Sequence, residues 1–179
     1  PAAVAALRHR LRAEADGLPL VGLAWTGGSP YTHSAERRIP LDMWHSVLRQ
    51  PVRFVSLEYR DADAEITAAA AAHGVSLVHL PDITQAHDYE RTCELVAALD
   101  LVITVPTSVL HVAGALGVPC WVVMSHRAAW RECSVNDRLP WYPQTHRRFV
   151  RPTGDPSWEG VLERIAAEIT CFAANNHRR

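Results

Sequence analysis

The sequence predicts an α/β fold, a doubly wound Rossmann-like parallel sheet, and three observations lead to that class. Short apolar runs without polar alternation recur along the chain, as in strands that are buried on both faces. Segments with helical spacing of apolar residues lie between these runs, and this alternation is typical of parallel sheets with right-handed crossovers. The length of 179 residues, 48% hydrophobic and 21% charged, suits one globular domain.

The elements follow one another along the chain in a regular order. Ala, Leu and Arg with helical spacing predict an N-terminal linker helix over residues 1–17, ahead of a single domain over residues 18–179. Strands are predicted at residues 20–25, 52–57, 75–80, 101–105 and 120–124, with a further short strand near Phe149. Helices are predicted at residues 41–49, 61–72, 89–99, 107–116 and 157–172.

Composition excludes several function classes. All 18 basic residues are Arg, so the chain has neither a Schiff-base lysine nor the lysine of a phosphate-binding loop. The net charge of −1 gives no reason to expect nucleic acid or an anionic membrane as a partner. The four cysteines form no C-x-x-C pair, and no apolar run approaches the roughly 20 residues that span a bilayer. We therefore expect a cytoplasmic protein without a membrane span, and Pro1 at the start suggests part of a longer chain.

The loop after the fourth predicted strand is a candidate anion site. Thr107 and Ser108 occupy the first turn of the following helix, where free backbone N–H groups and the helix dipole favour negative charge. His111 lies four residues after Thr107 and therefore on the same helical face. The alternative is ordinary: Thr and Ser often only cap helices, and a single His is often only packed.

The loop after the first strand is a second candidate. Thr26, Gly27 and Gly28 allow backbone to approach a ligand closely, and the same long loop carries Arg37 and Arg38. It lacks the G-x-G-x-x-G order of dinucleotide-binding loops, and a solvated surface loop is the simpler alternative.

Acidic residues after the next two strands are ambiguous. Glu58 follows the second strand and Asp82 the third; either carboxylate could bind ribose hydroxyls or be an ordinary loop acid. The ten histidines have no metal-ligand spacing, so we expect no metal, and no G-x-S-x-G motif supports a hydrolase.

A series of motifs, taken together, resembles a known family. The motifs run from VGLAWTG at residue 21 through RIPL at 38, FVSL at 54 and LDLVITV at 99 to HVAGALGVPCWV at 111, WR at 130 and PWYP at 140. The series is similar to the C-terminal half of heptosyltransferase-like glycosyltransferases (family 9-like) of the GT-B fold, especially those attached to tetratricopeptide repeats.

The resemblance implies that residues 18–179 bind a nucleotide-diphosphate sugar, with no separate cofactor. It implies that Thr107, Ser108 and His111 hold the diphosphate and sugar, while Thr26, Gly27 and Gly28, with Arg37 or Arg38, cover the phosphates. Glu58 would lie near the ribose, and Asp82 stays a weak ribose or base candidate from its position after the third strand alone. The implied enzyme transfers the sugar with inversion and without a metal, to a glycan or protein acceptor. Its catalytic base belongs to a separate N-terminal domain.

One position departs from the family pattern. Many members have Asp where this chain has Pro106, and proline supplies neither a carboxylate nor a backbone donor. This favours the alternative of a non-catalytic nucleotide-sugar-binding or interaction module with a degenerate donor site. A third possibility, a sugar-nucleotide epimerase of the same fold, would need Glu58 and Asp82 as catalytic acids.

Overall fold

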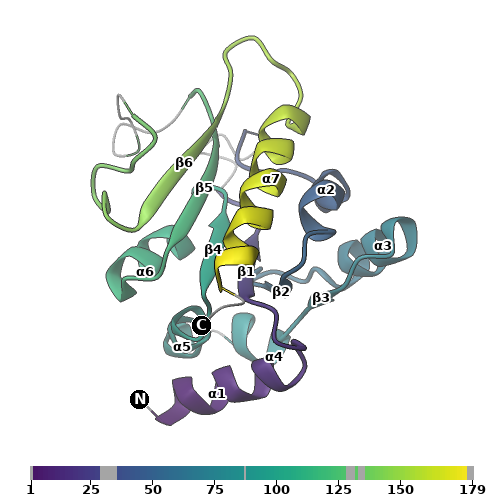
Figure 1. Ribbon diagram of the computed structural model, residues 1–179, viewed down its shortest axis with the longest axis vertical. Coiled ribbons are helices and arrows are strands. Elements are labelled where there is room, and N and C mark those ends of the chain that lie inside the picture. Colours follow the sequence, from purple (N-terminus) through teal and green to yellow (C-terminus); the bar gives the residue numbers. More distant parts are fainter. Residues whose placement is uncertain (1, 29–35, 87, 128–131, 133–135, 177–179) are drawn as a thin grey trace.

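The computed structural model describes residues 2–28, 36–86, 88–127, 132 and 136–176. Its centre is one parallel six-stranded sheet in the order β3-β2-β1-β4-β5-β6 (Figure 1). The strands are β1 (Leu20–Ala24), β2 (Arg53–Ser56), β3 (Leu77–Val78), β4 (Leu101–Thr104), β5 (Cys120–Ser125) and β6 (His146–Arg151). All pairings are parallel, which confirms the predicted doubly wound α/β class.

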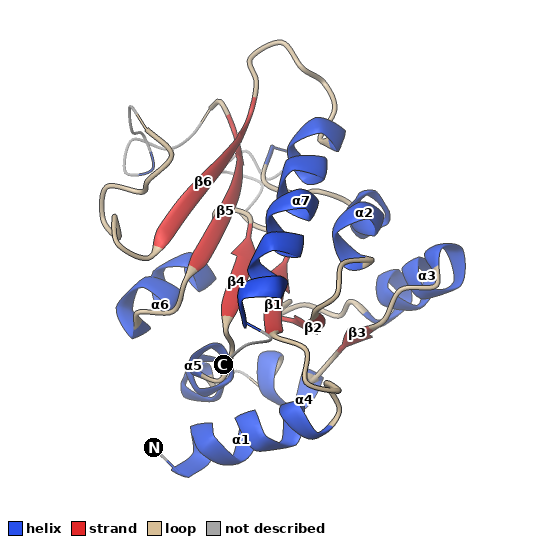
Figure 2. Ribbon diagram, in the orientation of Figure 1, coloured by secondary structure: helices blue, strands red, loops and turns tan. Residues whose placement is uncertain are grey.

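Helices cover both faces of this sheet (Figure 2). The elements are α1 (Ala2–Ala13), η3 (Leu41–Trp44), α2 (His45–Leu48), α3 (Asp63–His73), α4 (Pro81–Thr84), α5 (Tyr89–Ala97), α6 (Ser108–Leu116) and α7 (Glu159–Asn176). One apolar core joins the sheet to α2, α3 and α7, and the other joins it to α1, α5 and α6. Residues of β1, β4 and β5 contribute to both cores, which explains why these strands lack polar alternation.

The N-terminal helix packs directly on this second core. Leu11 and Ala15 are buried there, and α1 contacts α5. Asp100, directly before β4, accepts hydrogen bonds from Arg8, from Arg12 at 2.7 Å and from the Leu20 N–H at 2.8 Å. This carboxylate therefore ties the helix to the starts of the two central strands, while the predicted boundary after residue 17 stays a prediction.

The edges of the sheet differ from prediction. The strand predicted over residues 75–80 is only Leu77–Val78 at the sheet edge, where both residues are only half buried. The helix predicted over residues 41–49 begins as the 3₁₀ turn η3 and continues as α2. The short α4, which begins at Pro81, was not predicted because one turn shows no periodicity.

The reversal of strand order determines where a ligand is expected. The chain runs outward from β1 to β3, returns to β4 beside β1, and then runs outward on the other side. The chain therefore continues from β1 toward one edge of the sheet and from β4 toward the other, and open α/β sheets bind ligands at the carboxyl ends of strands at such a point. Both candidate loops of the sequence lie at this switch point.

Candidate functional site

The first turn of α6 is built at the end of a fully buried strand. β4 is buried throughout, and buried Val105 and Pro106 lead into Thr107, the extended N-cap residue. The Thr107 hydroxyl accepts a hydrogen bond from the Val109 N–H at 3.1 Å. Since a helix start has four N–H groups without intrahelical acceptors, this cap satisfies only one of them. Ser108, next along the chain, is exposed.

Two adjacent cavities share this helix start. The larger, about 390 Å³, is mostly apolar and is lined by the end of β1, the loop after β2 and parts of α4, α5 and α6. The exposed Tyr59 and Tyr89 are among its lining residues. The smaller, about 220 Å³, is lined by Gly28, Arg37, Pro106, Thr107, Ser108, His111 and Glu132. Thr107 and Ser108 line both cavities, so the N-terminus of α6 lies between an apolar and a polar compartment.

Backbone pairing joins the two ends of the loop after β1, and the start of this loop lies against the helix start. The Gly27 N–H donates to the Arg37 carbonyl at 2.9 Å, and the Ile39 N–H donates to the Trp25 carbonyl at 3.0 Å. Only glycine fits at position 27 without a shift, because a Cβ there would lie 2.7 Å from Thr107 Cγ2 and 2.8 Å from the Pro106 carbonyl oxygen. The two candidate loops are therefore in direct contact.

Arg37 and Arg38 have different surroundings. Thr26 and Arg38 form an antiparallel bridge, and successive side chains of an extended segment point to opposite sides. Arg37 lines the smaller cavity and makes no ion pair with any described residue. Arg38 instead lies 3.9 Å from the Glu65 carboxylate, and its side chain is 53% exposed. The structure thus selects Arg37 as the cation that faces the polar compartment.

Glu58 is enclosed beneath this loop. Its side chain is fully buried, and Oε1 accepts hydrogen bonds from the N–H groups of Trp25 and Thr26, both at 2.8 Å. Oε2 lies 3.1 Å from Arg60 Nε. Glu58 lines neither cavity. Its carboxylate therefore fixes the start of the loop.

Arg60 extends this support to the loop's side chains. Its Nη2 donates to Thr26 Oγ1 and to Glu65 Oε2, each at 2.7 Å. Burial raises the pKa of Glu58, and the two backbone hydrogen bonds and the charge of Arg60 oppose that rise only in part. Burial also raises the pKa of Glu65, but hydrogen bonds from Arg60 and the Leu41 N–H outweigh it, and the net pKa is lowered. A partly buried network of alternating charge, Glu58, Arg60 and Glu65, thus supports Thr26.

His111 lies on the cavity side of α6, as its spacing from Thr107 predicts. The ring is half buried and lines the smaller cavity, and Nδ1 lies 3.3 Å from the Tyr142 hydroxyl. Asp82 lies elsewhere: it is exposed on α4, 3.8 Å from Arg91, and lines neither cavity. Of the two acids considered for a ribose or epimerase role, neither reaches these cavities.

Several cavity residues were not predicted. Tyr59 follows Glu58 at the end of β2, and Tyr89 begins α5; their position at the carboxyl edge was the signal available for finding them. Glu132 is buried and lines the smaller cavity, yet it comes from a stretch without recognisable periodicity. The neighbouring Trp130-Arg131 motif lies outside the described residues.

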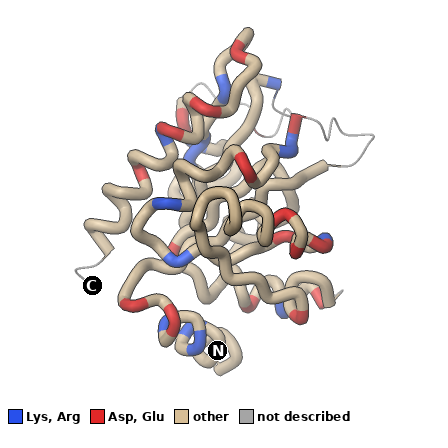
Figure 3. Tube along the Cα trace, turned by 90° about the vertical axis from the view of Figure 1, so that its right-hand side faces the viewer, with Lys and Arg blue, Asp and Glu red and all other residues tan. Residues whose placement is uncertain are grey.

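Neither the charged residues nor the possible metal ligands indicate a second candidate site in the part of the chain that the structure describes. Acidic and basic residues are mixed over much of the trace in Figure 3, although α1 and β6 each carry three Arg and no acidic residue. Within the described residues, no cluster of three or more His, Cys, Asp or Glu side chains could hold a metal ion. None of the helices described is long and apolar enough to cross a membrane.

Comparison with known proteins supports the fold and a distant relationship. No protein-family model matches the chain. The chain is a distant homologue of the protein FlbA of Caulobacter vibrioides, with 31% identity over 176 residues, 98% of this chain but only 29% of FlbA.

Solved structures show a similar fold at low identity. E. coli ADP-heptose lipopolysaccharide heptosyltransferase II matches with a TM-score of 0.63 and 15% identity, over 95% of this chain and 52% of its own. E. coli heptosyltransferase WaaC with ADP matches with a TM-score of 0.58 and 14% identity, over 90% of this chain and 45% of its own. A family 9 glycosyltransferase from Veillonella parvula matches with a TM-score of 0.55 and 15% identity, over 95% of this chain and 49% of its own. The chain therefore has the fold of about half of a heptosyltransferase.

Proposed function

We propose that this chain is the donor-binding half of a glycosyltransferase that uses a nucleotide-diphosphate sugar. The observation that carries the proposal is the first turn of α6, which lies between two cavities of different chemistry and is shared by both. A nucleotide-diphosphate sugar has the same order of parts: a flat apolar base, a dianionic bridge and a hydroxylated ring. The WaaC heptosyltransferase of similar fold was solved with ADP, which supports this ligand class.

Each compartment has groups suited to one part of the donor. The larger cavity offers Tyr59 and Tyr89 as aromatic faces for a base. The helix start offers the backbone N–H groups of its first turn and the positive end of its dipole to the diphosphate. The smaller cavity offers Arg37 and His111 to the phosphates, and His111 and Glu132 to the hydroxyls of the sugar.

The reaction follows from this placement. An acceptor hydroxyl attacks the anomeric carbon, the bond from that carbon to the diphosphate oxygen breaks, and the acceptor proton passes to a base. The diphosphate leaves with additional negative charge, and Arg37 and the α6 N-terminus lie where they stabilise it. The proposed base belongs to a second domain that faces this site, so this chain alone binds the donor without turning it over.

Calorimetry on the chain tests the assignment. ADP, UDP and GDP are titrated into the wild type and into the Thr107→Ala and His111→Ala variants, because each variant loses one group beside the diphosphate. We expect about 10- to 100-fold weaker binding of the preferred nucleotide, the range for one hydrogen bond to a charged group. Thr67→Ala and His9→Ala are matched controls on exposed helix positions. Unchanged affinity in both site variants would remove the assignment.

A second candidate is a binding module without transferase activity. Pro106 favours it, because this residue lines the smaller cavity and offers neither a side-chain acceptor nor a backbone donor there. Donor turnover by the full-length protein, lost on Arg37→Ala substitution, distinguishes the transferase from this module.

A further inference from the structure

An exposed tryptophan stands on a firmly packed turn beside the smaller cavity. The turn over residues 139–146 begins at buried Leu139 and ends at buried His146, yet Trp141 is 56% exposed. The Tyr142 N–H donates to the Leu139 carbonyl at 3.2 Å, and the His146 N–H donates to the Tyr142 carbonyl at 2.9 Å. The backbone around this indole is thus ordered by the chain itself.

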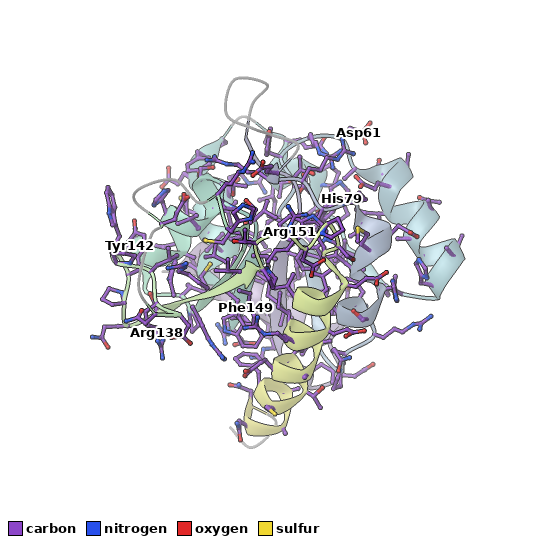
Figure 4. All side chains as sticks on the ribbon, turned by 90° about the horizontal axis from the view of Figure 1, so that it is seen from above. Asp61, His79, Arg138, Tyr142, Phe149 and Arg151 are labelled. Carbon is purple, nitrogen blue, oxygen red and sulfur yellow. The ribbon has the colours of Figure 1, made fainter. Side chains whose placement is uncertain are left out.

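The turn is fixed to α6 through Tyr142, which Figure 4 labels on the side of the molecule opposite Asp61. The Tyr142 ring packs on Gly114, where a Cβ would lie only 2.5 Å from the ring. Its hydroxyl lies 3.3 Å from His111 Nδ1, and His146 Nε2 lies 2.7 Å from the Leu110 carbonyl oxygen. Three contacts therefore set the position of the turn relative to the helix that bears the proposed anion site.

The indole of Trp141 packs against His111, one of the residues that line the smaller cavity. Its ring centroid lies 6.0 Å from that of His111, with 55° between the ring planes. His111 in turn lines the smaller cavity with Ser108 and Arg37. Trp141 does not line the smaller cavity itself; it packs against His111 and is thus separated from the cavity by one side chain.

We propose that Trp141 is the stacking platform for the sugar ring of the donor, an inference that rests on the proposed function. One face of a pyranose presents mainly C–H groups, which pack on the electron-rich face of an indole, while its hydroxyls bind polar side chains. The cavity beside Trp141 supplies such polar groups in Arg37, His111 and Glu132. The larger cavity has Tyr59 and Tyr89 as aromatic residues for the base, so the proposal gives the base and the sugar separate aromatic partners.

The prior ordering of the turn strengthens such a contact. A side chain held in place before binding loses little conformational freedom when the ligand arrives. Trp141 would thus determine how much the sugar adds to the affinity of the nucleoside diphosphate. It would have no effect on binding of the diphosphate itself.

The test measures the contribution of the sugar alone. Dissociation constants are determined by calorimetry for ADP, UDP and GDP and for ADP-glucose, UDP-glucose and GDP-mannose, and each sugar nucleotide is compared with its own diphosphate. For the preferred base, we expect Trp141→Ala to weaken sugar-nucleotide binding by roughly 2- to 12-fold, the range for one aromatic contact. Binding of the diphosphate should stay unchanged, and Trp141→Phe should restore part of the loss.

Two further variants separate this role from general damage. Gly114→Ala displaces the Tyr142 ring and so moves Trp141 while retaining the indole; it should lose the same sugar contribution. Leu116→Ala removes another exposed apolar side chain of α6 and should change neither affinity. Equal sugar contributions in the wild type and Trp141→Ala, or none in the wild type, would overturn the inference while leaving the diphosphate site intact. If none of the diphosphates binds, the proposed function fails first, and this inference fails with it.

Discussion

Replacement of Gly27 by Ala tests whether the two loops of the site depend on close contact. The added Cβ would lie 2.7 Å from Thr107 Cγ2 and 2.8 Å from the Pro106 carbonyl oxygen, and the second of these is backbone that cannot rotate away. Either the loop after β1 or the first turn of α6 must shift. Overpacking of this kind costs about 1–3 kcal/mol of unfolding free energy.

The cost converts to measurable changes. For a chain of this size, about 1 kcal/mol lowers Tm by roughly 2–4 °C, so we expect Tm to fall by roughly 2–12 °C in differential scanning calorimetry. Displacement of Arg37 from the helix start should also weaken nucleoside diphosphate binding by about 10-fold or more, the effect of one lost charged hydrogen bond. Isothermal calorimetry measures that loss.

Gly160→Ala is the matched control. A Cβ at Gly160 meets nothing within 4 Å, and alanine is the better helix former within α7. This variant should therefore keep the wild-type affinity and equal or exceed its Tm. The reasoning is refuted if Gly27→Ala has the wild-type Tm and the wild-type affinity.

Three other substitutions test the network, a buried histidine and the N-terminal clamp. Burial raises the pKa of Glu58 above 4.5, so the folded state holds this proton more tightly than the unfolded state. Wild-type stability therefore falls as pH rises from about 4.5 through the folded pKa, and Glu58→Gln should lack that decline in denaturant titrations at several pH values. Burial lowers the pKa of His146 below 6.5, so stability should fall as pH drops below 6.5; His146→Gln, which keeps a side-chain N–H for the Leu110 carbonyl, should not show this loss. An equal pH slope in variant and wild type would contradict either expectation. Asp100→Asn weakens the attachment of Arg8, Arg12 and Leu20 and should cost about 1–3 kcal/mol, with faster hydrogen exchange in α1 than in α7; uniform exchange would contradict a local clamp.

The central strands were predictable because burial on both faces requires an apolar residue at nearly every position of the strand. The run at Leu20–Ala24 is wholly apolar, and the structure buries all five residues. Elements at the edge of the sheet have a weaker sequence pattern. The strand β3 has only two residues, both half buried, and the single turn of α4 is too short to show a helical period.

The candidate site was predictable only where its residues are close in sequence. Thr107 and His111 share a helical face because they are four residues apart, and the structure places both beside the smaller cavity. The choice between Arg37 and Arg38 depended on the backbone bridge between Thr26 and Arg38, which no local pattern reveals.

Other site features depend on residues far apart in the chain. Glu58 binds the backbone at Trp25 and Thr26 because the parallel pairing of β1 and β2 brings their carboxyl ends together. Tyr59, Tyr89 and Glu132 approach the first turn of α6 from three different segments. Without the strand order, such residues appear as ordinary loop residues.

The most direct test of the account follows the backbone amide signals of the chain by NMR as a nucleoside diphosphate is added. Titration with ADP, UDP or GDP should shift the amides of Gly28 and Ser108 most strongly for the preferred base. The matching nucleoside without phosphate should leave the Gly28 signal nearly unchanged, and it should shift Ser108, which also lines the larger cavity, much less than the diphosphate does. Diphosphate-induced shifts that centre on other elements, or identical shifts with the bare nucleoside, would contradict the claim that the start of α6 is a diphosphate site.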